Sequence, residues 1–159
     1  MYIKDIQVDI LKDMCRVNPK HKVYFEDSIK NASILCVDGY VFYIIPSDME
    51  YLDVNKMRKF PGDVVSKNIA DVQSDEETVR FTGEVELVEN KRTGKNLEGM
   101  KLYHSDGKTI TYVDRALTKY FDFRNPMVKL TTKKDSTLSL VLVYEGGQLM
   151  GGVLPFRHV

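Results

Sequence analysis

The sequence contains no tryptophan, only two cysteines and no excess of charge of either sign. Two cysteines, Cys15 and Cys36, cannot build a disulfide framework, which favours a reducing compartment such as the cytoplasm. The balance of 23 basic and 23 acidic side chains excludes a wholly basic nucleic-acid binder, although charge can still gather on one face. No apolar run approaches the roughly 20 residues of a membrane helix, and charges interrupt the N-terminal segment where a signal peptide would lie. We therefore expect a soluble, cytoplasmic protein with no membrane partner.

What is present has the composition of one folded domain. Hydrophobic residues make up 43% and charged residues 29% of the 159 positions. No linker rich in Pro, Gly or Ser divides residues 1–159. The charge is uneven, however, with a net of −4 over 61–100 and +4 over 101–159. We expect a single domain in which 61–100 is an elaborated region of loop and strand.

Two segments have the pattern of main helices. The first carries apolar residues at helical spacing, namely Ile3, Ile6, Ile10 and Met14. The second, DRALTKYFDF, begins with Asp114 as its N-cap residue and is ended by Asn125-Pro126. Residues 52–60 are expected to form a short helix, and 63–77 a loop with at most one helical turn.

Alternating residues and turn signals predict strands elsewhere. The expected strands and hairpins are 22–26, 32–46 around Asp38-Gly39, 78–88, 100–113 around 105–107, 127–131, 137–144 and 149–154. Because tight turns replace long crossovers, we predict an α+β fold, an antiparallel sheet with two main helices packed on one face.

Signatures of catalysis and of metal binding are missing. The three histidines, His21, His104 and His158, stand far apart, and no pair has the spacing of a metal site. Cys36 lies within an apolar strand and is expected to be a small buried hydrophobic residue. The glycines of 145–152 fall between and within strands, which indicates a hairpin turn with a bulge or close packing instead of a phosphate loop. We expect no catalytic residue, no metal and no cofactor, hence no enzyme.

Basic residues repeat a helical spacing on both expected helices. Aligned side by side, the helices would present one stripe of cations, formed by Lys12, Arg16, Arg115, Lys119 and Arg124. Such a stripe contacts phosphates and gives weak, salt-dependent, sequence-independent binding to duplex DNA. The alternative is an ordinary solvent face of mixed charge, since Asp9 and Asp13 lie near the same side.

Several motifs, in their order, resemble the last half-domain of the bacterial DNA polymerase III sliding clamp, the beta subunit. Residues 112–121 are similar to the clamp helix, 138–143 to the penultimate strand, and 154–157 (Leu-Pro-Phe-Arg) to the closing tetrapeptide. Residues 35–45 are similar to the clamp hairpin, with Asp38-Gly39 at the turn. The resemblance covers about a third of the chain and implies a clamp-like domain whose helices face DNA.

The chain departs from the clamp pattern in three ways. It has the length of one domain where the clamp has three, Val41 or Phe42 replaces the hairpin arginine, and the clamp's interdomain peptide pocket has no counterpart. Encircling DNA would require a homo-oligomer joined through sheet edges, with the last strand as a candidate edge. The Lys-, Asp- and Ile-rich composition is typical of a phage or mobile element of low-GC bacteria.

We therefore expect a non-catalytic, DNA-associated accessory protein that acts through its basic helix face and self-association. The alternative is a protein-binding modulator of the replication machinery, such as a clamp-binding inhibitor. Residues 7–11 (QVDIL) resemble the peptide by which partners dock on bacterial clamps, through Gln7, Ile10 and Leu11. The helical spacing of Ile6 and Ile10 favours a core helix at the same place.

Overall fold

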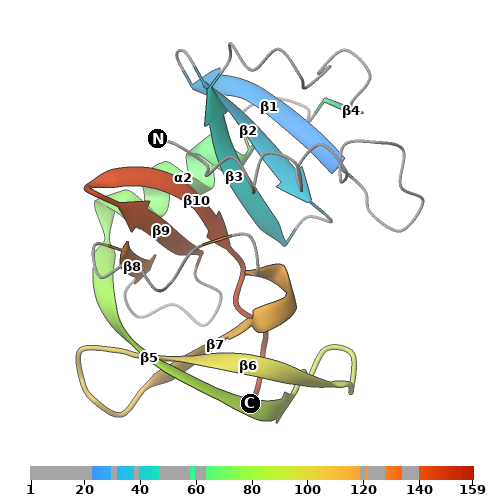
Figure 1. Ribbon diagram of the computed structural model, residues 1–159, viewed down its shortest axis with the longest axis vertical. Helices are drawn as coiled ribbons and strands as arrows, with labels where there is room; N and C mark the ends of the chain where they lie inside the picture. The colour runs from blue at the N-terminus through green and yellow to red at the C-terminus, as the bar shows by residue number, and fades with distance from the viewer. Residues whose placement is uncertain are drawn as a thin grey trace.

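The computed structural model places a curved antiparallel sheet at the centre of the molecule (Figure 1). It describes the residues 23–29, 32–37, 40–46, 58–59, 64–118, 121, 128–133 and 140–159. The first predicted helix, over residues 3–18, lies outside this part of the chain, as does most of the short helix predicted over 52–60. Arg58 and Lys59, at the end of the latter, form a short strand instead.

Ten strands form one sheet in the order β4-β1-β2-β3-β10-β9-β8-β5-β6-β7. Their bounds are β1 Val23–Ile29, β2 Ala32–Val37, β3 Val41–Pro46, β4 Arg58–Lys59, β5 Glu76–Glu89, β6 Asn96–Tyr103, β7 Ile110–Asp114, β8 Val128–Lys133, β9 Val141–Glu145 and β10 Gln148–Val153. All neighbouring pairs are antiparallel except β1 and β4. The predicted hairpins β2–β3, β6–β7 and β9–β10 are confirmed.

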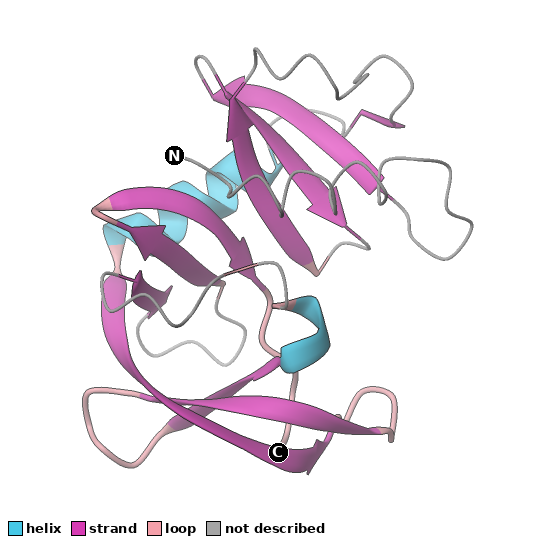
Figure 2. Cartoon of the chain, in the orientation of Figure 1, coloured by secondary structure: helices cyan, strands magenta, loops and turns pink. Residues whose placement is uncertain are grey.

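The prediction of two main helices packed on one face of the sheet is wrong. The described residues contain one α-helix, α2 (Val64–Ser74), and one 3-10 turn, η2 (Arg115–Leu117) (Figure 2). The helix α2 lies where the sequence predicts a loop. No helix in the described part of the chain is long and apolar enough to cross a membrane.

The second predicted helix begins at the expected residue, but its described start is a 3-10 turn and not an α-helix. Asp114 is its N-cap, and the carboxylate accepts a hydrogen bond of 3.0 Å from the Ala116 amide. Thr118 then closes the turn, because both its amide and its hydroxyl donate to the Arg115 carbonyl. The Thr118 side chain is buried, so water does not compete for these two hydrogen bonds. A single 3-10 turn therefore stands at the start of the segment predicted as a helix.

The sheet buries apolar side chains on both faces. On its inner face the strands curl around a core, the inner cluster, formed by Leu35, Val41, Tyr43, Ile45, Val79, Met100, Leu102, Val113, Leu130, Val141, Val143 and Val153. The outer face carries a second group under α2, the outer cluster, formed by Ile34, Cys36, Phe42, Val65, Ile69, Val72, Leu140 and Leu142. Successive strand residues alternate between the two clusters, as the period of a strand requires.

The last strand, β10, is a central strand and not the edge that the sequence suggested. It pairs with β3 on one side and β9 on the other. A bulge falls between Leu149 and Gly151, and a Cβ at Gly151 would overlap the Phe42 carbonyl oxygen. The predicted hairpin turn is also present, with Gly146 and Gly147 at positive φ. The interpretation of these glycines as a turn, a bulge and close packing is confirmed.

Candidate functional site

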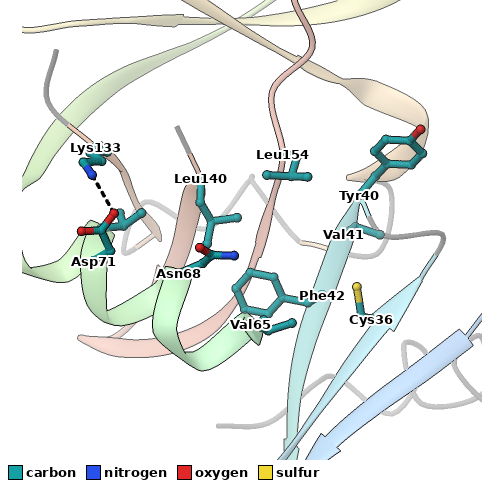
Figure 3. Close-up of a pocket in the computed structure, with 11 residues that line it drawn as sticks. Cys36, Tyr40, Val41, Phe42, Val65, Asn68, Asp71, Lys133, Leu140 and Leu154 are labelled. Atoms are coloured by element: carbon teal, nitrogen blue, oxygen red, sulfur yellow. Dashed lines mark hydrogen bonds and ion pairs between the residues drawn. The ribbon is translucent and has the colours of Figure 1, made fainter. Parts of the chain in front are cut away.

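A pocket of about 240 Å³ opens between α2 and the outer face of the sheet (Figure 3). Its wall is mainly apolar and comes from segments far apart in the sequence. The described lining residues are Cys36, Tyr40, Val41, Phe42, Val65, Asn68, Asp71, Val72, Lys133, Leu140 and Leu154. A concave, largely apolar site with a few polar groups is the usual form of a binding site.

Helix α2 forms one wall because three of its apolar residues face the sheet. Val65, Ile69 and Val72 recur at spacings of four and three, pack into the outer cluster and are buried. The helix is fixed at its start by Glu26 of β1, whose carboxylate oxygens accept hydrogen bonds from the amides of Val65 and Ser66 at 2.9 and 3.0 Å. The negative charge also suits the positive end of the helix dipole.

Two exposed apolar residues stand at the mouth of the pocket. Tyr40, at the turn before β3, is 43% exposed, and Leu154, just after β10, is 41% exposed. The Leu154 amide donates a hydrogen bond of 2.8 Å to the Tyr40 carbonyl, so the two backbones are held together. Exposed apolar side chains beside an apolar pocket are typical of a surface that binds another molecule, because binding removes their apolar area from water.

An ion pair lies at the rim, opposite these two residues (Figure 3). Lys133 Nζ of β8 lies 2.6 Å from Asp71 Oδ2 of α2. The hydrogen bond and charge of Asp71 raise the pKa of the Lys133 ammonium above its ordinary value. The Lys133 ammonium at this rim is therefore already paired with a carboxylate of the same chain.

Cys36 contributes its thiol to the pocket wall. It is buried within the outer cluster. The prediction that Cys36 is a small buried hydrophobic residue is confirmed. The described role of Cys36 is therefore packing within the outer cluster.

A second polar cluster links the start of β5 to the β6–β7 hairpin. Glu77 Oε1 accepts hydrogen bonds from the Ser105 amide at 2.7 Å and the Ser105 hydroxyl at 2.5 Å, and Glu77 Oε2 lies 3.3 Å from His104 Nδ1. His104 Nε2 in turn lies 2.6 Å from Thr111 Oγ1. Although hydroxyl, imidazole and carboxylate follow one another as in a catalytic triad, the carboxylate is shared among three donors. We interpret the cluster as a structural contact that holds the β6–β7 hairpin against the start of β5.

Lowering the pH should weaken this contact between Glu77 and the hairpin. The hydrogen bonds from Ser105, together with His104, lower the pKa of Glu77 below its ordinary value of 4.5. A carboxyl group with a lower pKa in the folded state contributes stability that is present above the unfolded pKa and lost as the pH falls through the folded pKa. Glu77→Gln, which mimics the protonated acid, should therefore destabilise the protein by about 1–2 kcal/mol at pH 7 and by progressively less below pH 4.5.

Thermal unfolding of the wild type and the variant across this pH range measures the effect. A difference in unfolding midpoint that stays constant down to about pH 3, well below the ordinary carboxyl pKa, would contradict the assigned role of Glu77.

Only one of the predicted DNA-binding residues is described. Arg115, in η2, is exposed and lies 3.7 Å from Glu98 of β6. An exposed ion pair of this kind contributes little to stability. Lys12, Arg16, Lys119 and Arg124 lie outside the described residues. DNA binding through these five residues stays a prediction.

The predicted protein-binding residues Gln7, Ile10 and Leu11 also lie outside the described part of the chain. The pocket residues on α2 were not identified from the sequence. A weak signal was present, since Val65, Ile69 and Val72 have helical spacing within a polar segment. Among the residues that the structure describes, no group of three or more His, Cys, Asp or Glu side chains is placed to hold a metal ion.

Comparison with known proteins identifies no relative of this chain. The motifs that resemble the sliding clamp are therefore the whole basis for that relationship, which stays a prediction. Function has to be inferred from the geometry and chemistry of the described residues. No protein-family model, no curated protein and no solved structure matches this chain.

Proposed function

We propose that the protein is a non-catalytic protein-binding module whose pocket receives one large apolar side chain of a partner. The observation that carries this function is the apolar pocket between α2 and the sheet, with Tyr40 and Leu154 exposed at its mouth. Interfaces are commonly anchored by an apolar or aromatic side chain in such a pocket, surrounded by residues that exclude water.

The size of the pocket favours a side chain over a cofactor. Sites for drug-sized molecules measure roughly 300–1,000 Å³, whereas this pocket measures about 240 Å³. Its volume suits a side chain such as leucine or phenylalanine. Full burial of such a side chain contributes about 1.5–3 kcal/mol, which is enough for an anchor but needs further contacts around it.

The rim supplies those contacts. Tyr40 offers an aromatic face, and Asn68 on the exposed side of α2 offers amide donors and an acceptor to a partner's backbone. The Lys133–Asp71 ion pair lies at the same rim, and its two opposite charges sum to zero. A partner is therefore selected by an apolar anchor with polar groups around it, and not by net charge.

Capped amino acids test the pocket without a known partner. We expect N-acetyl-leucinamide and N-acetyl-phenylalaninamide to shift the NMR signals of Val65, Asn68, Leu140 and Leu154, with dissociation constants of about 1 mM or weaker, near −4 kcal/mol. N-acetyl-glycinamide, which lacks the side chain, is the matched probe and should leave these signals in place. Equal shifts with all three probes would overturn the proposed function.

Filling the pocket should abolish this binding. Val65→Phe places a ring in the space that the probe would occupy, and we expect the affinity for N-acetyl-leucinamide to fall at least tenfold. The matched control is Ala70→Phe, which adds the same ring on the exposed face of α2 and should bind as the wild type does.

The same pair of variants tests whether the pocket is empty space. Extra atoms in a filled core cost about 1–3 kcal/mol. Val65→Phe should cost less because the pocket accommodates the ring, so its unfolding midpoint should stay within a few degrees of the wild type. Binding of the probe by Val65→Phe with undiminished affinity would place the apolar site elsewhere.

A further inference from the structure

Strand β5 is longer than the strand that pairs with it on one side. The pairing with β8 covers Glu76 to Val79, whereas the pairing with β6 continues to Glu89. A bulge near Gly83, at positive φ, turns the second half of β5 away from β8. Within the described residues, the segment Thr82–Glu89 thus pairs on one side only, and its alternate amides and carbonyls face an open edge.

The two faces of this edge differ in chemistry. Val85 lies opposite Met100, a member of the inner cluster, so Val85 and Leu87 belong to the inner face of the sheet. They are nevertheless 39% and 70% exposed. Leu87 is thus among the most exposed large apolar residues of the described chain, and it lies next to unpaired backbone.

The outer face of the same edge carries carboxylates. Lys101 Nζ lies 3.6 Å from Glu84 and 3.1 Å from Glu86. The Tyr112 hydroxyl also donates to Glu86, and this bond, with that from Lys101, lowers the pKa of Glu86. Within Thr82–Glu89 this face carries carboxylates, and the neighbouring cations are Lys101 of β6 and Arg80, before the bulge, which both lie over the Tyr103 ring.

The opposite edge of this part of the sheet is covered by the chain itself. The Phe156 amide donates to the Tyr112 carbonyl of β7, and the Phe156 ring stacks on Tyr112 at 6.1 Å. The Lys91 amide donates to the Arg157 carbonyl, which fixes the same tail across the sheet. The edge of β7 is therefore partly covered, whereas none of the described residues pairs with Thr82–Glu89 on the side away from β6.

We propose that the β5 edge, Thr82–Glu89, adds an extended segment of another protein in which large apolar and basic residues alternate. Its apolar residues contact Val85 and Leu87 on the inner face, and its basic residues face Glu84 and Glu86 on the outer face. Backbone hydrogen bonds supply affinity, and the alternation selects the register.

Charge disfavours a second copy of this chain as the occupant. Two β5 edges side by side would bring Glu84 and Glu86 against the same carboxylates of the copy, and like charges on facing strands are destabilising. A basic partner has the opposite effect. This surface does not involve the pocket under α2. The proposal for the β5 edge is therefore tested independently of the proposed function.

A capped heptapeptide of alternating lysine and valine tests the edge. We expect it to bind at least tenfold more tightly than the same peptide with glutamate in place of lysine, and more weakly at about 0.15 M than at about 0.01 M ionic strength, where charges are less screened. Methylation of alternate backbone amides of the lysine–valine peptide should abolish binding, because the hydrogen bonds to the edge are lost. Binding is measured by fluorescence anisotropy with the full-length protein.

Matched variants locate the site. Leu87→Thr keeps a residue that favours strands and should weaken peptide binding severalfold, whereas Leu154→Thr, at the mouth of the pocket, should not. Glu84→Lys should weaken binding, whereas Asp75→Lys, at an exposed position just before β5, should not. Equal affinity for the lysine and glutamate peptides, retention of binding after amide methylation, or a dimer in light scattering that Leu87→Thr dissociates would each overturn the assignment.

Discussion

Gly152→Ala should lower the midpoint of thermal unfolding by about 6–12 °C, one of the largest effects expected in this protein. A Cβ at Gly152 would lie 2.5 Å from the Phe42 ring and 2.8 Å from the Val141 carbonyl oxygen. Both neighbours belong to central strands and cannot move without disturbing β3 or β9. Overpacking of this kind costs about 3 kcal/mol, and 1 kcal/mol corresponds to about 2–4 °C in a chain of this length.

The matched control separates crowding from backbone conformation. Gly94 has φ of 73° and no atom within 4 Å of a Cβ, so Gly94→Ala bears only the cost of a left-handed conformation, about 1–2 kcal/mol. Calorimetry of the two variants should rank Gly152→Ala as the less stable. The reverse order would mean that β10 does not approach Phe42 as closely as the structure places it.

The sheet was largely predictable from local patterns. Alternating residues of 78–88 and of the hairpins give strands because successive side chains point to opposite faces. Residues 105–107 and 145–147 form turns because they accept conformations that other residues resist. These signals act within a few residues, so one sequence is enough to read them.

The helices were mispredicted because distant residues determine them. The acceptor that caps the first amides of helix α2 is Glu26, far away along the chain. In the helix predicted after Asp114, the apolar pattern around Leu117 and Phe121 favours a helix. Thr118 instead closes a 3-10 turn and packs against Met100 of β6. Tertiary contacts override the local preference in both places.

The candidate site was not predictable for a related reason. Cys36 was correctly identified as buried, but the pocket arises only when β2, β3, α2 and the segment after β10 come together. No residue of the pocket carries a motif, since apolar side chains leave no signature of spacing across such distances. The open edge of β5 likewise depends on the length of its neighbours, which is a property of the sheet and not of the strand.

Glu26→Ala should destabilise the protein by about 3–6 kcal/mol and detach the start of α2 from the sheet. Glu26 is 1% exposed, and both of its carboxylate oxygens accept hydrogen bonds from α2 amides. Each hydrogen bond to a charged group is worth about 1.5–3 kcal/mol, and its loss leaves a buried amide without a partner. Thermal unfolding measures the loss of stability. Amide hydrogen exchange at Val65 and Ser66 shows whether the loss begins at α2.

Two further variants define what the carboxylate does. Glu26→Gln keeps one acceptor oxygen and should lose about half as much stability as Glu26→Ala. Glu89→Ala, which removes an exposed carboxylate paired only with Lys91, should change stability by no more than about 0.5 kcal/mol. Because Glu26 positions the wall that carries Val65, Asn68 and Val72, Glu26→Ala should also lose binding of N-acetyl-leucinamide at temperatures where it remains folded. Full stability together with full binding in Glu26→Ala would show that α2 is held by its apolar face alone, and that the pocket does not depend on the carboxylate beneath the helix.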